Sequence, residues 1–248
     1  MKKEQIIQTC LEVSTGENYL EIGVGSGYGL VPIKAKRKWG VDPTILSPWE
    51  SFKDCLKKNT FSFREGIRFL RQRTGFLRDR VRLFEMTSDR FFETKSEFLD
   101  RYKIDVALVD GLHTYEQSLT DVINCLTYLR TGGFIVIHDC NPTTGAMAYP
   151  TNSREDAAKK KLPGWTGEWC GDVWKAIVHL RAHRDDLFVC VLDCDYGVGL
   201  VKRGKPESML DLPLEHIRDM PYQDLVSRRE ELLNLKHPDF LNDFIGHS

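Results

Sequence analysis

The sequence of 248 residues is 41% hydrophobic and 29% charged, which suits one large α/β domain, or one domain with additions. The formal net charge is −1 and no run of about 18 apolar residues occurs, so neither nucleic acid nor a membrane is an expected partner. Seven cysteines without a C-x-x-C pair favour neither a disulfide framework nor a zinc site. The first residues lack the apolar core of a signal peptide, and we expect a cytoplasmic protein.

Apolar runs alternate with helical stretches, and this alternation predicts a parallel sheet with crossover helices. Apolar residues recur at helical spacing over residues 121–130, and we expect the Gly132–Gly133 pair to end that helix. Two later apolar runs flank a turn and predict an antiparallel hairpin that closes the sheet. The expected strands are residues 19–23, 40–42, 81–84, 105–110 and 134–138, followed by the hairpin runs 187–193 and 198–204.

A basic insertion, residues 44–80, falls outside this alternation because it is long for a link between neighbouring strands. The stretch 53–82 carries ten Lys or Arg against three Asp or Glu. One interpretation is an amphipathic helix with a solvated basic face. The other is an arginine wall of Arg64, Arg68 and Arg71 that faces an anionic acceptor.

Two further segments also break the pattern. Residues 141–172 are rich in Pro, Gly and Trp and predict a long lid-like loop. Residues 205–248 predict a mostly helical, acidic C-terminal extension. We expect this extension to pack either on its own domain or on a second subunit, and its charge bias, opposite to that of the basic insertion, favours a homodimer contact.

A glycine-rich loop follows the first expected strand and contains, in order, Glu21, Gly23, Gly25 and Gly27. Glycines let a backbone turn tightly and approach a ligand closely. The dinucleotide fingerprint G-x-G-x-x-G fails here, because positions 28 and 30 are not glycine. An acid two residues before the first glycine suits the ammonium end of an amino-acid-like ligand and would repel a pyrophosphate.

Asp42 lies 19 residues after Gly23, at the end of the second expected strand. A carboxylate at that place can accept hydrogen bonds from both hydroxyls of a ribose. Together with Glu21 and the glycine spacing, it favours S-adenosylmethionine over a nicotinamide dinucleotide. The alternative is an ordinary strand–turn–helix connection that binds no ligand.

The motifs YLEIGVGSGYG and GVDP resemble the first and second motifs of the class I S-adenosylmethionine-dependent methyltransferases. DVALVDGLHTYEQSLTD, followed by GGFIVIHD, resembles the bacterial small-molecule O-methyltransferase branch, which includes macrocin O-methyltransferase-like enzymes and is distantly similar to catechol O-methyltransferase. The resemblance implies a Rossmann-like, doubly wound α/β sheet of seven strands, the last antiparallel, with helices on both faces. It implies a methyltransferase domain over residues 1–204.

The resemblance also implies positions for cofactor and metal. Ser88 and Asp89 match the adenine-contacting turn, and the alternative for both is a helix N-cap. Asp110 is expected beside the cofactor. Asp110 and Asp139 also match the two acids that bind magnesium in metal-dependent relatives. Asn141 or water would supply the third oxygen, and the alternative is that Asp139 positions the acceptor without a metal.

The expected catalytic residues are His113, His138 and Asp139. His113 follows the fourth strand, at a position similar to that of a catalytic lysine in the catechol enzymes. A neutral imidazole accepts a hydroxyl proton near pH 7, so His113 is the candidate base. The alternative for this histidine is helix capping or cofactor contact.

The expected function is therefore S-adenosylmethionine-dependent methyl transfer to the oxygen of a small hydroxylated acceptor, such as a sugar, a glycan or a natural-product intermediate. Magnesium is a second cofactor in one version of this hypothesis. The competing hypotheses are a nicotinamide-dependent oxidoreductase and a non-catalytic cofactor-binding module.

Overall fold

One mixed sheet organises the chain in the computed structural model, which describes residues 1–25, 27, 29–46 and 81–246. Its strands lie in the order β3-β2-β1-β4-β5-β7-β6-β8. The strand bounds are β1 (Asn18–Ile22), β2 (Arg37–Asp42), β3 (Val81–Glu85), β4 (Ile104–Val109), β5 (Leu129–Ile137), β6 (Leu187–Leu192), β7 (Val198–Arg203) and β8 (Leu235–Lys236).

The sheet confirms the expected Rossmann-like α/β fold. Strands β1 to β5 pair in parallel, and β7 runs antiparallel to both β5 and β6. The seven expected strands are all present. The eighth, β8, is a two-residue strand of the C-terminal extension that pairs in parallel with β6, and the sequence analysis did not predict it.

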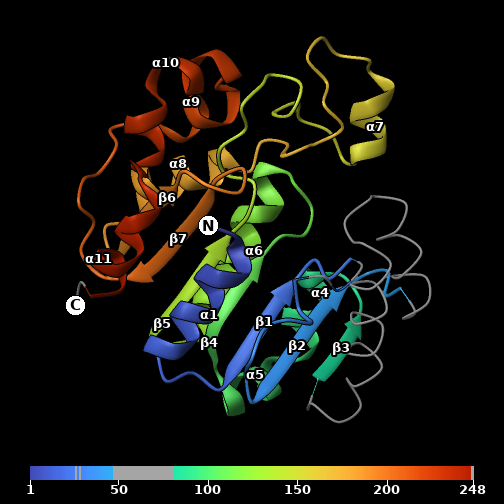
Figure 1. Cartoon of the computed structure of the whole chain (residues 1–248), viewed down its shortest axis with the longest axis vertical. Coiled ribbons are helices and arrows are strands. Elements are labelled where there is room, and N and C mark those ends of the chain that lie inside the picture. The colour runs from blue at the N-terminus through green and yellow to red at the C-terminus, as the bar shows by residue number, and fades with distance from the viewer. Residues whose placement is uncertain (26, 28, 47–80, 247–248) are drawn as a thin grey trace.

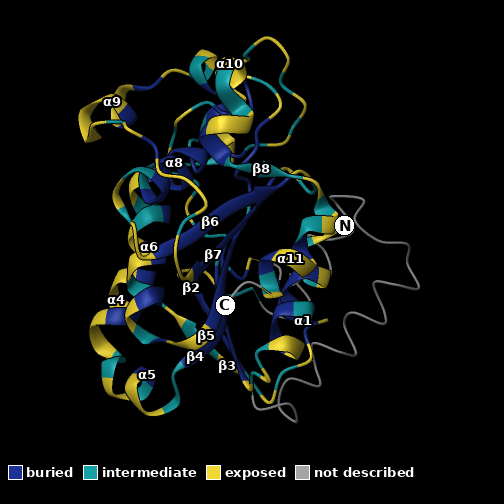
Figure 2. Cartoon of the chain, turned by 90° about the vertical axis from the view of Figure 1, so that its left-hand side faces the viewer, coloured by how far each residue is buried: buried dark blue, intermediate teal, exposed yellow. Residues whose placement is uncertain are grey.

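The helices cover both faces of the sheet, and Figure 2 shows the sheet between α1 and α11 on one side and α4, α5, α6 and α8 on the other. The helix bounds are α1 (Lys3–Val13), α4 (Ser88–Thr94), α5 (Ser96–Tyr102), α6 (Tyr115–Tyr128), α7 (Arg154–Lys159), α8 (Trp174–His183), α9 (Leu214–Asp219), α10 (Tyr222–Leu233), the short 3-10 helix η2 (Pro238–Phe240) and α11 (Leu241–Gly246).

The expected helix over 121–130 is displaced towards the N-terminus. Helix α6 begins after Thr114, whose side chain accepts a hydrogen bond from the Gln117 amide at 3.4 Å, and it ends at Tyr128. Gly132 and Gly133 do not end it, because they lie inside β5, where the pairing with β4 shifts register. Gly132 has a φ of 77°, which fits a bulge in the strand.

Two apolar clusters hold the layers together, one on each face of the sheet. On β4, Val106 and Leu108 belong to the cluster that includes Ile6 and Ile7 of α1, while the intervening Ala107 belongs to the opposite cluster. Every residue of β4 is buried, as expected for a central parallel strand covered on both faces. Burial of each large aliphatic side chain contributes about 1.5–3 kcal/mol, so α1 is firmly fixed to the sheet.

The C-terminal extension packs against α8 in the described chain. Leu225, Leu232 and Leu233 of α10 belong to the same buried cluster as Trp174. The buried Arg181 of α8 donates hydrogen bonds to the carbonyl oxygens of Glu231 and Leu232 at the end of α10. These contacts place the extension beside the end of the sheet that carries β6 (Figure 1). A homodimer stays a prediction.

The structure describes the lid-like segment but not most of the basic insertion. The lid-like segment 141–172 contains one short helix, α7, and otherwise runs without regular structure. Residues 47–80, with Arg64, Arg68 and Arg71, lie outside the described residues. Within the described ranges, no helix has both the length and the apolar character that crossing a bilayer requires.

Candidate active site

A cavity of about 640 Å³ opens at the carboxyl ends of β1 and β4. These strands are neighbours, and the strand order reverses between them, which is where open α/β sheets bind their ligands. The predicted residues that line it are Glu21, Gly23, Gly25, Asp42, Ser88, Asp89, Asp110 and His113. Other lining residues that the sequence analysis did not single out include Lys3, Gln117 and Asp121.

The loop after β1 bends around Gly23, whose φ is 86°. Its amide donates to the Val41 carbonyl at 2.9 Å, and a Cβ atom placed on it would lie 1.9 Å from the Asp110 carbonyl oxygen. Only glycine allows this approach between the ends of β1 and β4. Gly27 continues the loop, and its amide donates to the Val24 carbonyl at 2.7 Å.

Glu21 is buried at the floor of the cavity and accepts a hydrogen bond from the Tyr19 hydroxyl at 2.7 Å. Burial raises the pKa of Glu21 to about 8, although the Tyr19 hydrogen bond and the charge of Lys3 act in the opposite direction. This buried acid is therefore largely protonated at pH 7, and a cationic group bound beside it would favour its ionised form.

Asp42 ends β2 at the rim of the same cavity. Its two carboxylate oxygens accept the backbone amides of Gly25 and Thr44, each at 2.8 Å. These bonds orient the carboxylate, and each oxygen keeps a second lone pair for another donor. The arrangement suits a ligand with two adjacent hydroxyl groups.

Ser88 and Asp89 lie at the start of α4, whose first turn forms one wall of the cavity. The N-cap of this helix is Thr87, whose hydroxyl accepts from the Arg90 amide, so neither predicted residue is the N-cap. The Gln117 side-chain amide donates to Ser88 at 3.3 Å and to Asp89 at 3.1 Å.

The same Gln117 nitrogen also lies 3.1 Å from a carboxylate oxygen of Asp121 of α6. Burial raises the pKa of the Asp121 carboxyl to about 6. Its position beside Ser88 and Asp89 gives this wall three acceptor groups for an exocyclic amine.

The predicted reaction-centre residues meet where β4 and β5 end. His113 Nε2 lies 3.4 Å from Asp110 Oδ1, and His113 Nδ1 lies 3.4 Å from Asp139 Oδ2. His138 Nδ1 lies 3.4 Å from the same Asp110 oxygen and 3.2 Å from the same Asp139 oxygen. Two imidazoles thus bridge two carboxylates, and all four groups are largely shielded from solvent.

The His113 ring is held in place by the lid-like segment. Its Nδ1 lies 3.0 Å from the Trp169 carbonyl oxygen, and the Trp169 ring stacks on it at a centroid distance of 5.1 Å. The Trp169 indole in turn donates to the Tyr149 carbonyl at 2.9 Å. With Nδ1 donating to a carbonyl, Nε2 is the His113 atom available to take a proton.

The charges of this cluster shift several pKa values. Burial would lower the pKa of both His113 and His138, but Asp110 and Asp139 raise both above the usual range of histidine. Burial would raise the pKa of Asp110, but the charges of Lys3 and His138 hold it well below its usual range. The cluster therefore favours ion pairs over neutral acids and imidazoles.

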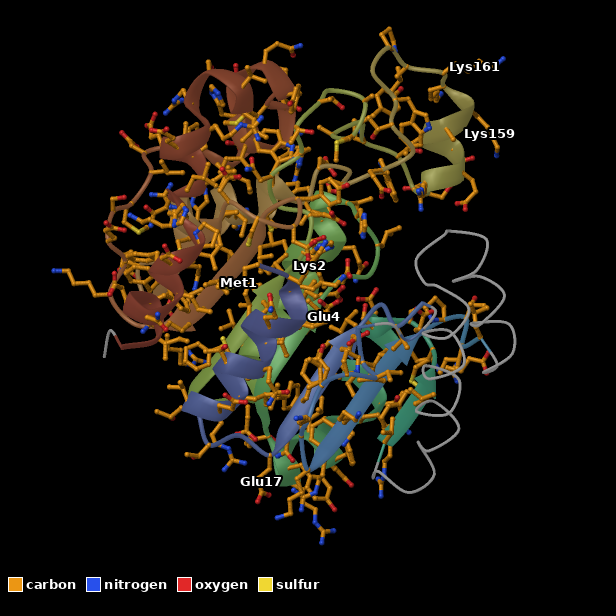
Figure 3. The ribbon with its side chains drawn as sticks, in the orientation of Figure 1. Met1, Lys2, Glu4, Glu17, Lys159 and Lys161 are labelled. Atoms are coloured by element: carbon orange, nitrogen blue, oxygen red, sulfur yellow. The ribbon has the colours of Figure 1, made fainter. Side chains whose placement is uncertain are left out.

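Lys3 is the functional candidate that the sequence analysis missed. Its Nζ atom lies 2.5 Å from Asp110 Oδ2, and both side chains are 16% exposed. In Figure 3, the flanking residues Lys2 and Glu4 lie where α1 begins, near the strand ends. No local motif marks this lysine, because its partner is 107 residues away along the chain.

Whether the cluster fits a divalent metal depends on its donor atoms. Asp110, His113 and Asp139 each offer one ligand atom, and these three atoms lie within 4.8 Å of one another. Three protein ligands are enough to bind a cation. Magnesium prefers oxygen donors, however, and one donor here is an imidazole. The second Asp110 oxygen already carries the Lys3 ammonium. Magnesium therefore does not fit this donor set as it stands.

Asn141, the predicted third ligand, follows β5, and its side chain bonds elsewhere. Its amide nitrogen donates to Asp193 at 2.9 Å, and its oxygen accepts from Arg229 of α10. Its role as a metal ligand stays a prediction.

Part of the chain is similar to known methyltransferases. Residues 20–140 match the family model of a methyltransferase domain. No curated protein sequence matches the chain significantly. Among solved structures, an O-methyltransferase from Bacillus cereus in complex with SAH is similar, with 13% identity, coverage of 82% of this chain and 80% of that one, and a TM-score of 0.51. A methyltransferase from Podospora anserina, bound to SAH, has 18% identity, coverage of 82% and 78%, and a TM-score of 0.49.

The matched region and the sheet order define an α/β enzyme domain with its ligand cavity at the strand reversal. Residues 20–140 are similar to a methyltransferase domain, and the motifs within them resemble those of the class I S-adenosylmethionine-dependent methyltransferases. The matched residues include the glycine loop, Asp42 and the ends of β4 and β5.

Gly23 and Gly25 provide a matched pair for testing the loop geometry. Both have a positive φ, but a Cβ atom on Gly25 would meet nothing within 4 Å. We expect Gly25→Ala to lower the free energy of unfolding by about 1 kcal/mol, from backbone strain alone. Gly23→Ala should lower it by about 3 kcal/mol or more, because the methyl group would overlap the Asp110 carbonyl. Urea unfolding measures both, and equal losses would contradict the close approach of β1 and β4.

Proposed function

We propose that the protein transfers the methyl group of S-adenosylmethionine to a hydroxyl oxygen of a small acceptor. The observation that carries the proposal is the position of the His113–Asp110 pair at the edge of the cavity that Glu21 and Asp42 line. The cofactor supplies a methyl group on a sulfonium, which is already activated for displacement. The protein therefore needs to align an acceptor oxygen and remove its proton.

Three groups of cavity residues would bind three different parts of the cofactor. Glu21 and the amides of the Gly23–Gly25 turn would hold the amino-acid end, and Asp42 would accept from the ribose hydroxyls. Ser88 and Asp89 would accept from the adenine amino group. Each assignment uses a group that borders the cavity.

His113 would act as the general base through its Nε2 atom. Asp110 beside it favours the protonated imidazole, which raises the affinity of Nε2 for the hydroxyl proton. Asp139 contacts the His113 ring and His138 contacts Asp110. These two residues would hold the imidazole and the acceptor in position for transfer. The histidine must lose its own proton before each cycle, so the rate should rise with pH until His113 is neutral.

The proposed class of acceptor follows from the chemistry of the base, His113, and not from the shape of an acceptor pocket. A base at the transfer point suits a hydroxyl acceptor, such as a sugar or a phenol. The preference for an anionic acceptor rests on Arg64, Arg68 and Arg71, which lie outside the described residues.

The raised pKa of Glu21 predicts that cofactor binding releases a proton. At pH 7 the acid is largely protonated, and the ammonium end of S-adenosylhomocysteine would convert it to the carboxylate. The buffer takes up the released proton, so calorimetric binding enthalpies should become more negative as the ionisation enthalpy of the buffer rises. Glu21→Gln should abolish this dependence and weaken binding about tenfold or more.

Glu17→Gln is the matched control, because Glu17 precedes the same strand but is exposed and paired with Lys36 and Arg37. It should leave both the affinity and the buffer dependence unchanged. Wild-type enthalpies that are independent of the buffer would contradict the assignment of Glu21 to the ammonium.

The base assignment predicts that His113→Gln lowers the rate of methyl transfer by about a hundredfold or more, while S-adenosylhomocysteine still binds. Labelled S-adenosylmethionine and a panel of catechols, phenols and glycosides give the measurement. His179→Gln is the control, since His179 bonds to Tyr115 and does not border the cavity. Transfer only to nitrogen or carbon acceptors would contradict O-methylation, and an unchanged rate in His113→Gln would reject the base.

A further inference from the structure

Several negative charges converge on the reaction centre and require compensation. One carboxylate oxygen of Asp110 lies within 4.8 Å of one carboxylate oxygen of Asp139. Asp195, from the turn between β6 and β7, adds a third carboxylate, with Oδ2 3.7 Å from His138 Nε2. Carboxylates this close repel one another unless a cation or a shared proton lies between them.

Lys3 provides a fixed cation in this cluster. Its ammonium contacts Asp110 at 2.5 Å, on the oxygen that does not face the two histidines. The other Asp110 oxygen remains 3.4 Å from His113 Nε2. Lys3 thus acts on the candidate base through Asp110 and is a positioning residue.

The lysine is held in place by more than this ion pair. Asp195 accepts the Lys3 backbone amide at 3.0 Å and the Lys2 ammonium at 2.7 Å, which fixes the first turn of α1. Behind it, Ile6 and Ile7 of α1 are fully buried against the sheet. The backbone of Lys3 is therefore anchored where its side chain reaches Asp110.

The position of Lys3 also distinguishes it from a peripheral salt bridge. It lines the same cavity as Glu21, Gly23 and Asp110. An ammonium on Asp110 Oδ2 neutralises the carboxylate and would repel a divalent cation bound at Oδ1, the oxygen that faces His113.

We infer that Lys3 takes the place of a divalent metal at Asp110, so that methyl transfer by this protein requires no added metal ion. The claim that methyl transfer needs no metal rests on the proposed function. The occupation of Asp110 by Lys3, in contrast, is testable without any acceptor. Lys3 neutralises Asp110, keeps its other oxygen facing His113, and disfavours a second cation between Asp110 and Asp139 by charge repulsion.

Manganese is a suitable probe, because its paramagnetic signal is lost on binding and it accepts oxygen and imidazole donors. The full chain is titrated with Mn²⁺ and the free ion is measured by electron paramagnetic resonance. Lys3→Met should bind Mn²⁺ about tenfold or more tightly than wild type, which is about 1.4 kcal/mol. A further Asp110→Asn change in that variant should remove the gain, and Lys3→Arg should behave like wild type.

Lys2→Met is the matched control, because Lys2 neighbours Lys3 but is 72% exposed and bonds to Asp195 instead of Asp110. Its Mn²⁺ binding should equal that of wild type. Thermal unfolding and S-adenosylhomocysteine affinity report whether each variant is folded, and Lys3→Gln replaces Lys3→Met if that variant is not.

Two results would overturn the inference. One is tight Mn²⁺ binding by wild type that Asp110→Asn abolishes, and the other is no gain in a folded Lys3→Met or Lys3→Gln variant. Wild-type transfer should also persist in EDTA, and loss of transfer that Mg²⁺ restores would contradict metal independence. If wild type fails to bind S-adenosylhomocysteine, the proposed function fails, whereas the Mn²⁺ titration still reports on Lys3.

Discussion

The close approach of the β1 and β4 strand ends at Gly23 and the Asp110 carbonyl is the constraint on which the site depends. It brings the cofactor loop to the start of the reaction centre, since Asp110 is both the residue that meets Gly23 and the partner of His113. The parallel pairing of β1 and β4, buried on both faces, fixes this contact. One edge of the sheet thereby carries both the proposed cofactor loop and the proposed base.

Electrostatics at that edge follows from burial rather than from net charge, which is only −1 over the chain. Burial raises the pKa of Glu21 to about 8, whereas Asp110 is ionised because Lys3 and His138 lie against it. The pKa values of these two buried acids thus shift in opposite directions because their charged neighbours differ. The first is suited to respond to a bound cation, and the second to orient an imidazole.

Local patterns in the sequence predicted much of this arrangement. Apolar runs located the strands, and the acid-glycine loop with Asp42 located the cavity, because strand burial and tight turns impose local residue choices. The Gly132–Gly133 pair was misinterpreted as a helix end, since glycine also fits a strand bulge. Lys3 and Asp195 could not be predicted, because their contacts join distant segments through packing and leave no spacing signal. The basic insertion lies outside the described residues.

The identity of the nucleoside ligand is the most direct test of the whole account, and calorimetry on the folded full chain with S-adenosylhomocysteine and, separately, NAD measures it. An acid at the loop and a failed dinucleotide fingerprint predict saturable binding of the first ligand and none of the second. A folded protein that binds NAD, or that leaves S-adenosylhomocysteine unbound at millimolar concentration, would contradict the assignment of this cavity to a methyl donor.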